Sequence, residues 1–422
     1  MPLKTSATAV LLVFLSAGSA AAQNAAAVVA AASKAMGADT LTSITYSGTA
    51  RNGAFGQSKS IGDPMGPVNV TQVTQYVRTI NFGQAADPAA LVSRATGPTQ
   101  PPTVPGVPPP APGVFNQNIT GNQATNNWNQ ALNIWTSPWG FLKGAAANNA
   151  TVRQEGGQQA VSFTPPGFKS PSGQTYSVTG YIDKQNLVTK VETRVDHAVV
   201  GDLLVEFEYS GYQNRNGVQV PGRIVQRQAG LQTFDANITA GTPNPPNLTE
   251  LLTPPPAPAR GGGAPGAGAP AGAPAGAPGA PGAGGQRGGG PGGPAGAPGG
   301  PPAAAAPVER LGDGAFKIGG NYTSLAIDMG DHILVVESGQ SDARGLAVMA
   351  AAKQAIPNKP IRFVVNSHPH FDHASGLAAA VAEGATILTH RNNEEVLERL
   401  LAGPRTLIGD SLSKVANRRK NV

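Results

Sequence analysis

The amino-acid sequence predicts an α+β protein with an N-terminal curved antiparallel β-sheet and a separate C-terminal unit of strands and helices. Three observations lead to this class. Residues 23–253 carry several runs in which apolar and polar side chains alternate, as in strands with one wet face. Residues 254–307 are almost entirely Ala, Gly and Pro and cannot build a core. In residues 308–422, strand patterns alternate with helical patterns, which indicates a layered α/β unit.

The composition agrees with a chain that contains a long linker. The 422 residues include 55 Gly and 39 Pro, whereas 13% are charged and 5% are aromatic. The formal net charge is +6, the basic residues are scattered, and no recognition motif accompanies them, so we expect no nucleic-acid partner. The chain has no cysteine, which excludes disulfides, thiolate metal ligands and a cysteine nucleophile.

The first 22 residues have the pattern of a secretory signal peptide. Lys4 provides the charged start, Ala9–Leu15 the apolar middle, and Ala20-Ala21-Ala22 a small-residue cleavage site. The apolar run is too short to span a bilayer, and no later run is long enough. We therefore expect a periplasmic or secreted protein without a transmembrane segment. An uncleaved N-terminal anchor is the alternative.

The N-terminal part begins with one helix and continues as strands. Ala25 to Met36 has helical periodicity, and Gly37 ends it. The period-two runs that follow are Ile44–Thr49, Val70–Ile80, Ala160–Phe163, Thr175–Ile182, Leu187–Val195, Leu203–Tyr209 and Val218–Gln226. A helix followed by such a meander resembles the curved sheet of the outer-membrane lipoprotein carriers. The resemblance implies a module that binds an apolar ligand.

Two features interrupt this predicted sheet. Pro98–Gly113 is dense in proline and is expected to form a long extended loop. The three tryptophans, Trp128, Trp135 and Trp139, are close together in the sequence and are expected in the core, with an apolar ligand groove as the alternative. His197 has no spaced partner and is expected to be a surface or capping residue.

The C-terminal part is predicted in more detail. Its strands are expected at Val308–Leu311, Ala315–Ile318, Tyr322–Ile327, Ile333–Glu337, Ile361–Asn366 and Thr386–Thr389. Ser341 is expected to cap a helix that runs to about Ile356 and buries Leu346, Met349 and Ala350. Further helices are expected after Ser375 or Gly376 and before Gly403-Pro404.

The stretch from Ser367 to His373 holds three of the six histidines of the chain. In an extended backbone His368 and His370 point to the same side, and Asp372 has the same parity. His373 falls where the chain turns into the next helix, so it is expected to point elsewhere. Scattered surface or core histidines do not account for four potential ligands within six positions. Neutral imidazoles with a carboxylate suit zinc, with iron or manganese as alternatives.

The spacing His368-x-His370-x-Asp372-His373 resembles the signature of the metallo-β-lactamase superfamily of metallo-hydrolases, from about Val308 onward. The resemblance implies the first half of an αββα sandwich, a small-molecule substrate and one or two zinc ions. It assigns His368 and His370 to the first ion and Asp372 and His373 to the second, and we expect Asp372 to be the catalytic carboxylate. Two strand-end carboxylates, Asp328 and Glu337, are either orienters of these imidazoles or ordinary surface groups.

The sequence departs from the superfamily after the motif. The resemblance implies a further His, a bridging Asp and a last His well downstream, but the 49 residues after His373 hold one histidine, His390, and one aspartate, Asp410. His390 follows too soon to be the third ligand and is expected to be hydrogen-bonded or at the site rim. We therefore expect a truncated or fragmentary hydrolase, weak metal binding and an exposed apolar sheet face. A dimer or another chain that supplies the missing half is the alternative, and the oligomeric state stays open.

Two functions follow from the sequence. The first is an exported zinc-dependent hydrolase that uses a metal-activated water. The second is a periplasmic binding or carrier module for an apolar ligand, in which the metal segment is vestigial.

Overall fold

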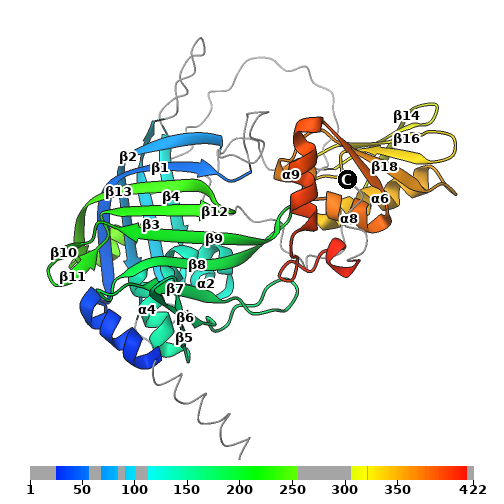
Figure 1. The fold of residues 1–422 in the computed structure, drawn as a ribbon. Coiled ribbons are helices and arrows are strands. Elements are labelled where there is room, and N and C mark those ends of the chain that lie inside the picture. The colour runs from blue at the N-terminus through cyan, green and yellow to red at the C-terminus, as the bar shows by residue number, and fades with distance from the viewer. Residues whose placement is uncertain are drawn as a thin grey trace, which may run out of the picture.

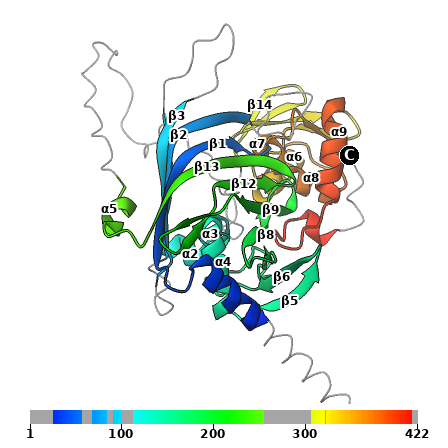
Figure 2. The same cartoon turned by 60° about the vertical axis from the view of Figure 1, so that its left-hand side comes forward.

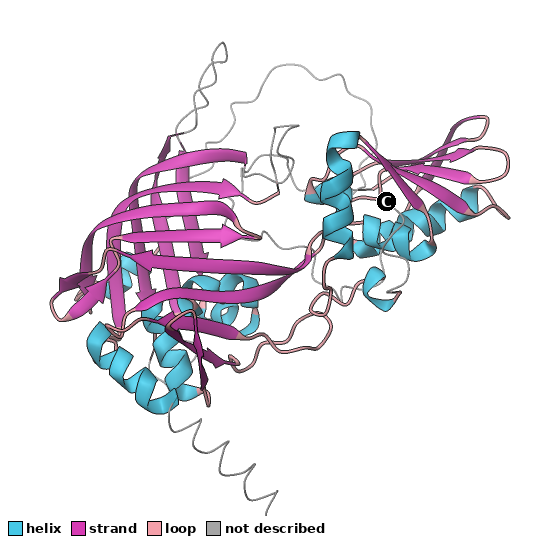
Figure 3. Cartoon of the chain, viewed as in Figure 1, coloured by secondary structure: helices cyan, strands magenta, loops and turns pink. Residues whose placement is uncertain are grey.

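The computed structural model describes residues 25–56, 68–83, 91–100, 113–254, 306–320 and 322–415. The predicted signal peptide, nearly all of the predicted linker and the C-terminal tail lie outside these residues. The described chain forms a large antiparallel sheet followed by a smaller mixed sheet with helices (Figures 1 and 3), which confirms the predicted α+β class.

The N-terminal sheet curves around its own helices. In spatial order its strands are β4 (Gly113–Ile119), β3 (Val92–Gln100), β2 (Val68–Asn81), β1 (Ser43–Ala54), β13 (Leu231–Pro243), β12 (Arg223–Gln228), β9 (Gly201–Ser210), β8 (Val188–His197), β7 (Val178–Ile182), β6 (Gln158–Phe163) and β5 (Thr151–Glu155). A small hairpin adds β10 (Gln213–Arg215) and β11 (Val218–Val220). All pairings are antiparallel, and short turns join β5 to β6, β7 to β8, β8 to β9 and β12 to β13.

The period-two runs agree with β1, β2, β6, β7, β8 and β9, whereas β4, β5, β10 and β13 were not predicted. The run Val218–Gln226 divides into β11 and β12, because Pro221 and Gly222 interrupt the ladder. Pro98 does not begin a loop: it lies in β3, paired with Val114 of β4. The loop prediction was wrong there because β3 gains its partner from beyond the prolines, and residues 101–112 lie outside the described chain.

Helices fill the concave side of the sheet (Figure 2). They are a helix over residues 25–36, α2 (Gly121–Asn126), α3 (Trp128–Trp135) and α4 (Pro138–Ala147), while α5 (Leu248–Leu252) follows the last strand. Trp128 and Trp139 are almost fully buried in one core with Phe141, which confirms the core interpretation of the tryptophans. Gly180 has no room for a Cβ, since that atom would lie 2.3 Å from the Phe141 ring. The absence of a side chain at Gly180 therefore allows Phe141 of α4 to pack directly against the sheet.

The C-terminal sheet has antiparallel strands at one side and parallel strands at the other. In spatial order it consists of β14 (Val308–Gly312), β15 (Ala315–Ile318), β16 (Ser324–Asp328), β17 (Ile333–Val336), β18 (Ile361–Asn366) and β19 (Thr386–Thr389). β17, β18 and β19 are parallel, as crossover helices require. The helices are α6 (Asp342–Ala355), α7 (Phe371–Ala374), α8 (Leu377–Glu383), α9 (Arg391–Ala402) and the short η2 (Leu412–Lys414).

Helix α6 begins after Ser341, whose hydroxyl accepts the backbone N–H of Arg344, as predicted. Of its predicted buried face, Met349 is confirmed, whereas Leu346 and Ala350 are exposed. Leu346 is 45% exposed, and its neighbour Gly345 is buried together with Met349. A Cβ at Gly345 would lie 2.5 Å from the carbonyl oxygen of Gly376, so the helix packs through its small residue and not through the leucine.

The sheet face opposite α6 and α8 is apolar. In β17, Ile333 and Val335 are buried, whereas the alternate residues Leu334 and Val336 keep some exposure. The same alternation continues onto β18 and β19, where Leu388 is 40% exposed. Within the described residues, this face agrees with the exposed apolar surface predicted for half a sandwich.

The chain after α9 returns to the N-terminal sheet (Figure 1). Arg405 donates hydrogen bonds to the carbonyl oxygens of Ala198 and Val199, at 2.7 and 2.9 Å, and pairs with Asp410. The side chains of Arg405 and Asp410 are 0% and 2% exposed. Asp202 accepts the backbone N–H of Leu407 at 2.9 Å. This buried ionic contact fixes the two parts of the chain to each other.

His197 lies beside this contact, at the turn between β8 and β9. Its Nδ1 accepts the backbone N–H groups of Val199 and Val200, so the predicted capping role is confirmed, although the side chain is half-buried and not on the open surface. Burial, followed by the charge of Arg405, lowers the pKa of His197 to about 4.

Replacing Arg405 by Met is expected to reduce the free energy of unfolding by about 3–5 kcal/mol, because the carboxylate of Asp410 stays buried without an opposite charge. Arg362→Met is the control: it removes an exposed pair with Asp331 and should cost less than about 1 kcal/mol. Urea denaturation measures both. Arg405→Met/Asp410→Leu should recover part of the loss, and an Arg405→Met variant as stable as Arg362→Met would contradict this role.

The pKa of His197 predicts that stability falls as the pH falls. The unfolded chain binds the proton at the ordinary pKa of 6.5, whereas the folded chain binds it at about 4. The neutral imidazole of His197 therefore makes its full contribution to the free energy of unfolding above about pH 6.5. This contribution, about 1–3 kcal/mol, is lost as the pH falls through about 4. His197→Asn keeps an acceptor for the turn and does not titrate. Urea denaturation at several pH values should show a flatter profile for His197→Asn, and identical profiles would exclude His197 as the cause.

Candidate metal centre

The histidine motif begins where β18 ends. Val364 and Asn366 of β18 are buried, and Asn366 Nδ2 donates to the carbonyl oxygen of His373 at 3.3 Å. This bond folds the motif back over the strand that precedes it. The chain then leaves the sheet at Ser367, as the sequence predicts for a strand-to-helix junction.

The backbone is extended through His370 and then turns. His370 precedes α7 with φ −60° and ψ 148°, and its carbonyl oxygen accepts the N–H groups of His373 and Ala374. Asp372 therefore lies in a helical turn, not in the extended chain expected from parity. The turn still brings it to the histidines, since His368, His370 and Asp372 each offer a ligand atom within 4.8 Å of the others.

The imidazole rings are in close contact. The ring centroid of His368 lies 4.4 Å from that of His370 and 4.1 Å from that of His373. Burial lowers the pKa of His368, and the neighbouring His373 and His370 lower it further. The neutral imidazole is the form that binds a metal. The crowding therefore favours the ligand form of His368.

His373 is held between two carboxylates. Its Nδ1 lies 3.2 Å from Glu337 Oε2, and its Nε2 lies 3.4 Å from Asp372 Oδ2. The predicted pairing of His373 with Asp372 thus appears as a contact, while His373 lies outside the group of three. The assignment of these residues to one ion or two stays a prediction.

Glu337 supports the motif from the end of β17. Its Oε1 accepts the backbone N–H of Ser367 at 3.0 Å, and its own N–H donates to the carbonyl oxygen of Val365. Its φ of 64° is rare for a residue other than glycine. Of the two strand-end carboxylates, Glu337 contacts a predicted ligand, whereas Asp328 pairs with Lys359. The sequence pattern placed Glu337 at the end of a strand. The parallel pairing of β17 with β18 is what brings its carboxylate to His373.

Two residues beyond the motif hold it in place. Ser367 Oγ lies 2.8 Å from His368 Nδ1, which leaves Nε2 of that ring for a ligand. Asn393 Nδ2 donates to Thr389 Oγ1 at 3.1 Å and reaches the carbonyl oxygen of Ser367 at 3.4 Å. Sequence reasoning missed Asn393, and no spacing pointed to it. His390 begins α9, where its Nδ1 accepts the N–H of Asn392, in agreement with a hydrogen-bonded residue.

The donor set fits a zinc ion. Two imidazoles and a carboxylate converge, and zinc is commonly bound by three such protein ligands and a water. Glu337 Oε2 is buried without a hydrogen-bond partner, next to His373 Nδ1. A carboxylate in this position orients a histidine whose other nitrogen binds a metal. Iron and manganese accept the same donors.

The comparison with protein families identifies the segment around this site. Residues 318–400 match the metallo-beta-lactamase superfamily. This match confirms the resemblance read from the motif, and the matched segment contains all four predicted ligands. A comparison with curated proteins gives no match.

Solved structures resemble each part of the chain separately. A metallo-beta-lactamase from Hirschia baltica is 25% identical over 23% of this chain and 48% of its own, with a TM-score of 0.21. The mono-zinc form of a Pseudomonas aeruginosa metallo-beta-lactamase is 18% identical over 26% of this chain and 50% of its own, with a TM-score of 0.21. The chain thus spans about half the length of these enzymes.

The N-terminal part resembles other structures. A LolA superfamily protein from Nitrosomonas europaea is 12% identical over 54% of this chain and 96% of its own, with a TM-score of 0.29. Across the described residues, no helix is both long and apolar enough to cross a membrane.

Replacing Glu337 by Gln is expected to weaken zinc binding about 10- to 100-fold. The amide oxygen still accepts the Ser367 N–H, but the amide nitrogen then faces His373 Nδ1, and the imidazole loses its acceptor. Asp328→Asn is the matched control, because this carboxylate pairs with Lys359 instead. Competition with a chromophoric chelator measures both affinities. Equal zinc affinity of Glu337→Gln and the unmodified chain would refute the orienting role.

Proposed function

We propose that this chain is an exported metallo-hydrolase whose C-terminal part binds zinc through His368, His370, Asp372 and His373. The observation that carries the proposal is the convergence of His368, His370 and Asp372 within 4.8 Å, inside a segment that matches the metallo-beta-lactamase superfamily. The signal-peptide pattern of residues 1–22 supports export to the periplasm or the medium.

The metal supplies the chemistry that the side chains lack: bound zinc polarises an acyl or phosphoryl oxygen and lowers the pKa of water toward neutrality. His368 and His370 hold it as neutral imidazoles. Asp372 lies beside them and accepts, through a carboxylate oxygen, the proton of the attacking water. Glu337 keeps His373 turned toward the site.

The substrate class is a small molecule with a hydrolysable ester, amide, thioester or phosphate bond. The motif fixes the metal chemistry, whereas substrate choice depends on the loops around a site. The similarity to metallo-beta-lactamases therefore does not assign a β-lactam substrate to this chain.

Metal analysis of the purified full chain tests the proposal. The unmodified protein is expected to hold close to one equivalent of zinc, and His368→Ala should lose most of it, because two of the three converging donors, His370 and Asp372, then remain. His390→Ala is the control, since its Nδ1 serves the helix start. Less than about a tenth of an equivalent, unchanged by His368→Ala, would refute a zinc site in this chain.

Activity provides the second test. Hydrolysis of a panel of ester, thioester, phosphodiester and β-lactam substrates should disappear on treatment with a chelator and return with added zinc. Asp372→Asn should abolish that activity by at least about 100-fold, since it removes a ligand and the proton acceptor. Activity that survives the chelator or Asp372→Asn unchanged would exclude the proposed chemistry.

A further inference from the structure

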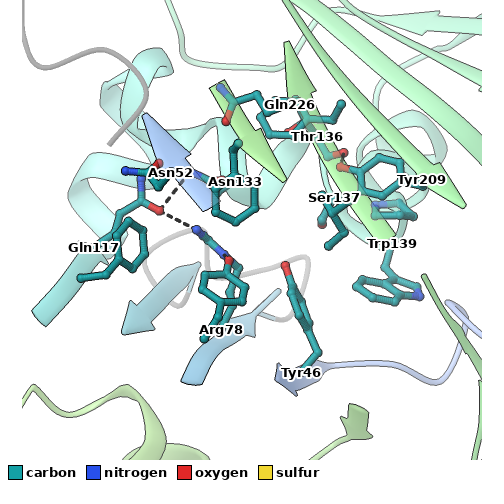
Figure 4. A pocket seen from close by; sticks show the side chains of 16 residues that line it. Tyr46, Asn52, Arg78, Gln117, Asn133, Thr136, Ser137, Trp139, Tyr209 and Gln226 are labelled. Carbon is teal, nitrogen blue, oxygen red and sulfur yellow. Dashed lines mark hydrogen bonds between the residues drawn. The ribbon is translucent and has the colours of Figure 1, made fainter. Parts of the chain in front are cut away.

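A cavity lies on the concave side of the N-terminal sheet, between the strands and helices α3 and α4 (Figure 4). Its volume is about 30 Å³, which is room for about two water molecules or one small polar group. Most of its lining is aromatic, contributed by Tyr46, Tyr76, Phe115, Trp139, Phe207, Tyr209 and Phe234. The cavity belongs to the part of the chain that the proposed hydrolase chemistry does not use.

Arg78 lies in the wall of this cavity and is 4% exposed. Its Nε donates to the Tyr76 hydroxyl at 2.7 Å, one terminal nitrogen donates to Gln117 Oε1 at 2.6 Å, and the other reaches Ser93 Oγ at 3.3 Å. A guanidinium carries five N–H groups, so these three acceptors leave two N–H groups for another partner.

The charge of Arg78 has no anion to balance it in the described structure. No Asp or Glu is found among the described residues that line the cavity, and all three recorded acceptors of Arg78 are neutral groups. Burial raises the pKa of Tyr46 and Tyr209, so these phenols stay neutral and supply no negative charge. Buried charges in proteins are normally paired, because an isolated charge is costly away from water.

A second polar group in the same wall has an unused donor. Gln226 is 3% exposed, and its Nε2 is buried without a hydrogen-bond partner. It belongs to β12, whereas Arg78 belongs to β2, and Figure 4 shows that both side chains line the cavity. A buried amide without a partner is rare, and it indicates an acceptor that the site is built to receive.

We propose that this cavity binds a small carboxylate. Arg78 forms the ion pair, Gln226 Nε2 donates a further hydrogen bond, and the aromatic side chains surround the few carbon atoms of the acid. The guanidinium matches a carboxylate in shape, since two of its N–H groups can donate in parallel to the two oxygens. The volume of about 30 Å³ limits the ligand to an acid of the size of formate or acetate. The inference is independent of the proposed metal site.

Calorimetric titration of the full chain with acetate, octanoate and acetamide tests the inference. Acetate is expected to bind, and acetamide, which has a similar shape without the charge, at least about tenfold more weakly. Octanoate tests the size limit of the cavity and is expected to bind more weakly than acetate. Tighter binding of octanoate than of acetate would contradict a site for a small acid.

Two variants assign the binding to this cavity. Arg78→Met should weaken acetate binding at least about tenfold, whereas Arg51→Gln, which changes an exposed arginine of the same sheet, should leave it unchanged. Circular dichroism and urea denaturation verify that each variant is folded. If Arg78→Met does not fold, Gln226→Leu gives the same test with a smaller loss. Absence of acetate binding, equal binding of acetamide, or undiminished binding by the folded variants would overturn the proposal.

Discussion

The parallel pairing of β17 with β18 is the constraint on which the candidate metal centre depends. It aligns Val336 with Val365, so that Glu337, which follows β17, lies at the same edge of the sheet as Asn366, the last residue of β18. Glu337 then binds the Ser367 backbone and faces His373, while Asn366 holds the carbonyl oxygen of His373. The histidines converge because strand pairing fixes both ends of the motif. The positive φ of Glu337 is the local strain that this arrangement requires.

The two parts of the chain use their buried charges differently. At the contact between the parts, the charge of Arg405 is balanced by Asp410 and by two backbone carbonyl oxygens, so the pair is complete within the chain. Inside the curved sheet, the three side chains that accept hydrogen bonds from Arg78 in the described structure are all neutral. The first arrangement is typical of a structural contact, and the second is typical of a site that receives its counter-charge from a ligand.

Local residue chemistry explains which predictions were confirmed. The period-two runs located most strands, since half-buried strands impose alternation wherever they pair. Ser341 and Gly376 marked the starts of α6 and α8, because the start of a helix depends on one or two residues. The buried face of α6 was wrong at Leu346 because leucine is more hydrophobic than Gly345, whereas packing against Gly376 requires a residue without a side chain. Sequence patterns also failed at the end of β3, because Pro98 pairs there with Val114 of β4, which follows a long connection.

The sequence by itself determined the chemistry of the motif. Three histidines and an aspartate within six positions bring four possible metal ligands together whatever their exact geometry, because the chain keeps neighbours together. Only the tertiary structure decided which groups lie against them and which charges are left without a partner. Glu337, Asn393 and the guanidinium of Arg78 reach their surroundings through residues distant in the sequence. Such contacts depend on the register and curvature of the sheets, which no local pattern of residues encodes.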